Sequence, residues 1–190
     1  MGPTGSDIIK DWPEESREAA QLVIDKRGEP NEATDSTLIW TEVDEWKRIV
    51  ATRAWFAHDF PAPHTDSVES FIDYRVPVDK FTALAEFDGS VIVERTAGEV
   101  SARCHDEEAN RLALNLMHDI VVGAKTVEEA REYYGQEFAG YRRKDPTPYM
   151  ASLRFEPASP GSAIDADERI LSDADLEQAQ QQGERKKVGG

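Results

Sequence analysis

The chain has 190 residues, enough for one ordinary domain with tails and too few for two full hydrophobic cores. Its 38 acidic and 22 basic residues give a formal net charge of −16, and we expect no nucleic-acid partner, because phosphate binding needs a clustered basic surface. No stretch approaches the roughly 18 consecutive apolar residues of a membrane span, so we expect no membrane partner, and the single cysteine favours a reducing, cytoplasmic location.

The first part of the chain predicts a helix followed by a hairpin. Residues 1–11 are expected to be disordered. A helix is predicted over residues 13–27, where proline and two glutamates open the first turn and Gly28 provides a C-cap. Two β-prone runs, 37–42 and 46–54, are close enough in sequence to form a hairpin.

The middle of the chain alternates between strands and helices. Two prolines predict an irregular loop over residues 57–66, and the alternation over 68–76 predicts a strand. Proline then opens a helix over 77–87. Residues 90–95 and 99–104 are separated by a tight reversal and predict a second hairpin.

Two further helices and a polar tail complete the sequence. Apolar residues at helical spacing predict a helix over 106–122, and a capping box at Thr126 opens another over 126–138. Residues 157–190 have the composition of an acidic, low-complexity tail with a short helix. Its terminal diglycine is expected to be a flexible end.

The elements follow the order helix, three strands, helix, two strands, two helices. Strands that are joined by hairpins predict a mainly antiparallel sheet, here of about five strands. With helices on one face, this sheet would form a two-layer α+β sandwich. We expect a single domain over residues 12–156.

Four stretches carry a resemblance to other proteins: DWPEESREAAQLVIDKRGEP, WKRIV, FPAPHTD, and FDGSVIVERTAGEVSARC running into ALNLMHDIVVG. Through them the chain resembles a group of uncharacterised bacterial proteins over about residues 7–155. No activity is attached to that group, so the resemblance implies neither catalytic residues nor a cofactor.

Side chains of the kinds that bind metal ions fall in two parts of the chain. They are His58, His64 and Asp66 in the proline-rich loop, and Cys104, His105, His118 and Asp119 around the helix predicted over 106–122. Their nitrogen, oxygen and sulfur atoms suit zinc or a similar ion, with His58, His64 and His118 as the leading candidate ligands. The spacing matches no local metal-binding pattern, and the alternative is that these histidines lie on the surface or are satisfied in the core.

The predicted central helix also carries a polar stripe. If this stripe faced the proline-rich loop, a polar cleft would form from His58, His64, Asp66, His105, Arg111, Asn115, His118 and Asp119. The alternative is a solvated helix face. Cys104 alternates with Val100 and Ala102, so we expect its thiol to be buried and structural rather than nucleophilic.

The composition and these patterns favour a non-catalytic accessory protein that binds a protein partner and needs no cofactor. The alternative is a metal-dependent hydrolase or another small-molecule enzyme that uses the histidine, aspartate and cysteine residues. Elemental analysis of the purified protein separates the two hypotheses.

Overall fold

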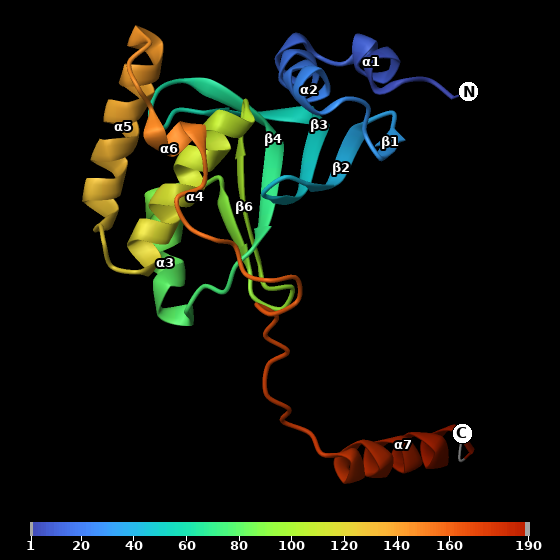
Figure 1. Cartoon of the computed structure of the whole chain (residues 1–190). Coiled ribbons are helices and arrows are strands. Elements are labelled where there is room, and N and C mark those ends of the chain that lie inside the picture. The colour runs from blue at the N-terminus through green and yellow to red at the C-terminus, as the bar shows by residue number, and fades with distance from the viewer. Residues whose placement is uncertain (1, 189–190) are drawn as a thin grey trace.

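The structure is a computed structural model that describes residues 2–188. Six antiparallel strands form one sheet, in the order β1-β2-β3-β4-β6-β5 (Figure 1). They are β1 (Glu32–Thr34), β2 (Thr37–Val43), β3 (Trp46–His58), β4 (His64–Asp73), β5 (Val91–Glu94) and β6 (Glu99–Cys104). The predicted antiparallel sheet is confirmed, with one short edge strand, β1, more than expected. Both predicted hairpins are present, as β2–β3 and β5–β6.

Helices cover one face of this sheet, as predicted. The helices are α1 (Gly5–Ile8), α2 (Glu14–Arg27), α3 (Phe81–Phe87), α4 (Glu107–Val121), α5 (Val127–Arg143), α6 (Pro148–Ala151) and α7 (Asp173–Val188), with 3-10 turns η1 (Ile9–Asp11) and η2 (Val78–Lys80). Helix α7 is the exception, since it lies apart from the sheet (Figure 1). Helix α2 packs against β3 and β4, and α4 packs against β4 and β6. Among the described residues, no helix has both the length and the apolar character needed to span a membrane.

The core lies between the sheet and the helices. Leu38, Ala51, Val68 and Cys104 are register partners across four neighbouring strands, and all are buried. The expected inward position of Cys104 is therefore confirmed. Burial raises the pKa of its thiol well above the ordinary value, as expected for a structural cysteine.

The N-terminal segment is ordered, so the expected disorder is wrong for residues 4–11. Thr4 and Asp7 form a capping box that opens α1. Ile9 then enters the core with 2% of its surface exposed. One buried isoleucine within a polar stretch gives no periodic signal, although it is enough to fix a short helix by tertiary packing.

The chain beyond α6 also packs on the body. Residues 152–167, which we call the strap, cross the end of the sheet (Figure 1). The Ala158 amide donates to the Asp73 carbonyl, Ala163 is buried, and the Asp165 carboxylate lies 3.3 Å from an Arg95 nitrogen. Residues 157–167 are therefore not the free linker that their composition suggests. Helix α7 stands away from the body, and Gly189 and Gly190 lie outside the described residues.

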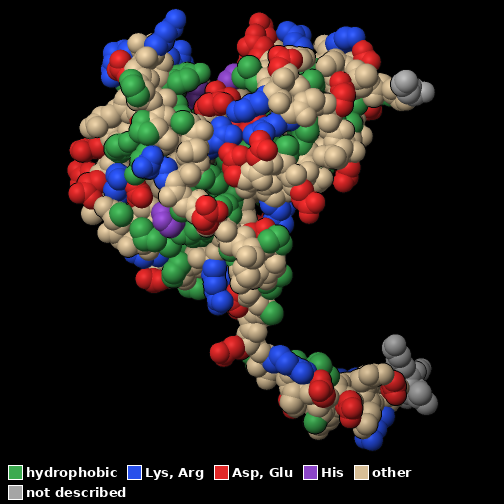
Figure 2. Space-filling model, viewed as in Figure 1, with side chains coloured by type: hydrophobic (Ala, Val, Ile, Leu, Met, Phe, Trp, Pro, Cys, Tyr) green, Lys and Arg blue, Asp and Glu red, His purple; other side chains and the backbone are tan. Residues whose placement is uncertain are grey.

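Charged side chains are spread over the surface of the molecule (Figure 2). On the face shown in Figure 2, acidic and basic side chains are interspersed, and no continuous basic surface is present on it.

Candidate metal centre

The β3–β4 hairpin brings the two histidines of the proline-rich segment together. His58 is the last residue of β3, His64 is the first of β4, and the two are direct register partners. The irregular loop is therefore confined to residues 59–63 rather than 57–66. Directly opposed antiparallel residues have Cβ atoms about 5 Å apart, and alternate residues on one strand share a side, which adds Asp66 to the pair.

These three side chains converge on one point. His58 Nδ1 lies 3.2 Å from Asp66 Oδ2, and His64 Nε2 lies 3.1 Å from Asp66 Oδ1. One ligand atom from each residue can be chosen so that all lie within 4.8 Å of one another. Ligand bonds of about 2.0–2.1 Å at tetrahedral angles place neighbouring ligand atoms about 3.3 Å apart. The two observed separations are close to this value, but they involve different oxygens of Asp66, so binding of one ion through a single oxygen requires the carboxylate to rotate.

The atoms that face one another lack hydrogen-bond partners. Among the described residues, His58 Nδ1, His64 Nε2 and Asp66 Oδ1 are buried and make no hydrogen bond, although both ring nitrogens lie within 3.2 Å of an Asp66 oxygen. Other atoms of the same residues are bonded: His64 Nδ1 lies 2.8 Å from the Ala62 carbonyl oxygen, and the Ser90 hydroxyl donates to Asp66 Oδ2, the oxygen nearer His58. Buried polar atoms without hydrogen-bond partners are uncommon, and three that converge have the donor set and geometry to bind one ion.

Burial and neighbouring charges shift the pKa values of two groups in or beside the cluster, His64 and Asp88. Burial lowers the pKa of His64, but the adjacent Asp66 carboxylate and the Ala62 carbonyl outweigh burial, so the pKa is raised overall. Burial raises the pKa of Asp88, which lies beside the cluster, and the nearby Asp66 carboxylate raises it further. The cluster therefore concentrates negative charge where a cation would neutralise it.

Two members of this site were missed by sequence analysis. Asp88 Oδ1 lies 3.7 Å from His58 Nε2, and Ser90 contacts Asp66. The sequence Asp88-Gly89-Ser90 gives a clear turn signal, and nothing in its local pattern indicates that the turn lies against the β3–β4 hairpin.

The predicted polar cleft along α4 is wrong, because the strap and its neighbours cover that face of the helix. Asn115 is 1% exposed, donates to the carbonyls of Tyr149 and Ser152, and accepts from the Arg154 amide. His118 Nδ1 lies 2.8 Å from the Tyr74 hydroxyl.

The remaining candidate residues either form ion pairs elsewhere or lie outside the group formed by His58, His64 and Asp66. The Asp119 carboxylate lies 2.7 Å from Lys125 Nζ, and Arg111 Nε lies 2.5 Å from a Glu45 oxygen. Cys104, His105 and His118 are not part of the converging group. Of the eight residues of the predicted cleft, the structure brings together His58, His64 and Asp66.

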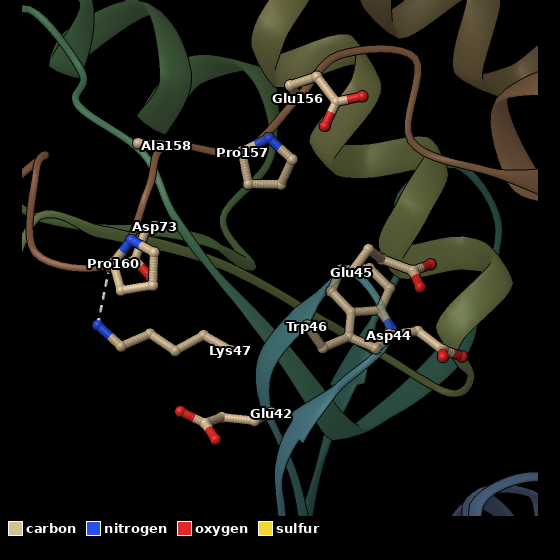
Figure 3. A pocket seen from close by; sticks show the side chains of 10 residues that line it. All are labelled: Glu42, Asp44, Glu45, Trp46, Lys47, Asp73, Glu156, Pro157, Ala158 and Pro160. Carbon is tan, nitrogen blue, oxygen red and sulfur yellow. Dashed lines mark hydrogen bonds and ion pairs between the residues drawn. The ribbon is translucent and has the colours of Figure 1, made fainter.

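A second concave feature, the acidic groove, separates the β2–β3 turn from the strap (Figure 3). Its walls include Glu42, Glu45 and Trp46 of the hairpin and Glu156, Pro157 and Pro160 of the strap. The hollow measures about 490 Å³. Glu45 is paired with Arg111, whereas Glu42 and Glu156 have no ion-pair partner among residues 2–186, whose side chains the structure describes.

No protein-family model, curated protein or solved structure matches the chain. The arrangement of the site is thus the basis for inferring function. Two imidazole nitrogens and one carboxylate oxygen form a ligand set typical of zinc and of ferrous iron.

Proposed function

We propose that the protein binds a divalent transition-metal ion of the zinc type through His58 Nδ1, His64 Nε2 and one oxygen of Asp66. The convergence of three buried, unpartnered ligand atoms supports this proposal. Three protein ligands leave one coordination position for water, and zinc lowers the pKa of such a water to about 7. That chemistry would suit the hydrolase alternative.

Metal analysis of the purified protein tests this function. After incubation with zinc and removal of the excess, we expect about one equivalent in the wild type by elemental analysis. His64→Ala should reduce zinc affinity at least about 100-fold in calorimetric titration, since it removes a direct ligand. His118→Ala is the matched control, because His118 lies outside the cluster. Absence of stoichiometric zinc from the wild type would contradict the proposal.

The accessory-protein hypothesis is a second candidate, supported by the acidic groove. Its carboxylates and proline walls complement a lysine- or arginine-rich segment of a protein partner, in agreement with the net charge of −16. Such a partner would be met in the cytoplasm under this proposal. A basic peptide should bind in low salt and weaken in Glu42→Gln/Glu156→Gln protein. Equal binding by wild type and variant would exclude this groove as the binding surface.

A further inference from the structure

The turn between α3 and β5 contacts two of the three proposed ligands from behind. Asp88 Oδ1 lies 3.7 Å from His58 Nε2, which is the ring nitrogen opposite the one that faces Asp66. The Ser90 hydroxyl donates to Asp66 Oδ2. The Ser90 amide in turn donates to Asp88 Oδ1 at 2.8 Å, so both supporting side chains belong to one hydrogen-bonded turn.

We propose that the Asp88–Gly89–Ser90 turn positions the metal ligands. Asp88 is placed to accept the Nε2–H of His58 once their 3.7 Å separation shortens, which leaves Nδ1 for the ion. Ser90 donates to Oδ2 of Asp66, and Oδ1 makes no hydrogen bond. This inference rests on the proposed metal-binding function. Neutral imidazole carries one N–H, and the hydrogen bond made by one nitrogen decides which nitrogen can act as a ligand.

His64 follows the same rule with a different partner. Its Nδ1 lies 2.8 Å from the Ala62 carbonyl oxygen, which can accept only from an N–H, and Nε2 is left as the free nitrogen. His64 and Asp66 are thus each supported by a hydrogen bond to a residue outside the ligand set, and Asp88 is the group beside His58 Nε2. The 3.7 Å separation at His58 exceeds hydrogen-bond length, so this contact has to shorten when the ion binds.

Packing around the turn keeps the supporting residues in place. Phe87, which precedes the turn, is fully buried and lies 6.2 Å from Phe60 of the hairpin loop, measured between ring centroids. Arg131 of α5 donates to the Phe87 carbonyl, and its guanidinium lies 3.9 Å from the Phe60 ring centroid. The turn and the hairpin loop are therefore held by the same residues, a requirement for precise ligand positioning.

Zinc titration of full-length variants tests this role. Asp88→Asn keeps the shape of the side chain but weakens its acceptor, and Ser90→Ala removes one hydroxyl. We expect each to lower zinc affinity about 10–100-fold while about one equivalent still binds at saturation. Asp59→Asn is the control, since Asp59 is an exposed carboxylate in the same hairpin loop and should leave zinc affinity unchanged.

A second readout separates positioning from a general effect on folding. In ¹⁵N spectra of the zinc-loaded wild type, His58 should carry its proton on Nε2, and Asp88→Asn should allow a mixture of the two ring forms. Wild-type zinc affinity together with an unchanged His58 signal in Asp88→Asn would overturn the positioning role alone. Failure of the wild type to bind zinc would overturn the proposed function, and this inference with it.

Discussion

Replacing Glu107 with alanine should destabilise the protein strongly, because this residue joins three elements of the fold. Its carboxylate accepts from Arg27 of α2 at 3.1 and 2.6 Å and from the Trp46 indole of β3 at 2.8 Å. It also lies 3.2 Å from Arg111 Nη2, one turn along α4. The Glu107 side chain is 2% exposed, so water cannot replace these contacts.

The expected loss follows from what remains after truncation. Arg27 and Arg111 stay buried with less compensation, and breaking a buried ion pair in this way costs about 3–5 kcal/mol. The Trp46 N–H also loses its acceptor, at about 1–3 kcal/mol. Asp44 and Glu45 still neutralise part of the two arginine charges, so we expect a decrease in unfolding free energy of about 3–4 kcal/mol.

Urea unfolding monitored by tryptophan fluorescence measures this loss. Glu108→Ala is the matched control: Glu108 is the next residue along α4, is 39% exposed and pairs with Lys26, so its removal should cost less than about 1 kcal/mol. Equal effects of the two variants would refute the reasoning. So would a Glu107→Ala loss of less than about 1 kcal/mol.

Two further predictions concern the β5–β6 hairpin. A Cβ on Gly98, where φ is +66°, would lie 2.4 Å from the Ala163 carbonyl carbon. Gly98→Ala should therefore lower the free energy of unfolding by about 2–4 kcal/mol, measured by thermal unfolding. Gly123→Ala is the control and should cost about 1 kcal/mol, because φ is +77° there but the surrounding space is open. Hydrogen bonds from Arg48 lower the pKa of Glu99 to about 2 from 4.5. The ionised Glu99 therefore stabilises the folded protein by about 1–2 kcal/mol. This contribution is complete above pH 4.5 and is lost as the pH falls toward 2. The unfolding free energy of Glu99→Gln should fall less steeply over that interval, and a parallel decrease would contradict the prediction.

The regular elements could be predicted because their signals are local. Gly28 ends α2 with a φ of +80°, and the Thr126 capping box begins α5 as expected. Strand β1 has three exposed residues and exists because it pairs with β2, so it leaves no hydrophobic pattern. The strap was missed for a similar reason, since its order depends on contacts with distant residues such as Asp73.

The candidate site was only partly predictable for the same physical reason. Its three ligand residues were selected by type, but their convergence depends on register, and prolines within the turn concealed the pairing of His58 with His64. On α4, periodicity alone could not distinguish a solvated polar stripe from one that satisfies the backbone of another segment. Asn115 belongs to the second kind, because all its bonds go to residues 149–154.

Asp66 and Asn115 allow the metal proposal to be tested through stability. Both are 1% exposed, but Asn115 has all its partners, whereas Asp66 Oδ1 has none among the described residues. In EDTA at pH 8, Asp66→Asn should change the unfolding free energy by less than about 1 kcal/mol, since the amide oxygen can still accept from Ser90 and the substitution removes a buried charge. Asn115→Asp should cost at least about 3 kcal/mol, because it replaces a donor to two carbonyls with an acceptor.

Zinc should make Asp66→Asn measurably less stable than the wild type. At about 100 times the dissociation constant, bound zinc should stabilise the wild type by about 2.7 kcal/mol and leave Asp66→Asn largely unaffected. If Asp66→Asn instead loses as much stability in EDTA as Asn115→Asp, the carboxylate is a structural ion-pair partner of His58 and His64. The unpartnered atoms would then have to be explained by protonated histidines, and the structural argument for a metal ion would fail.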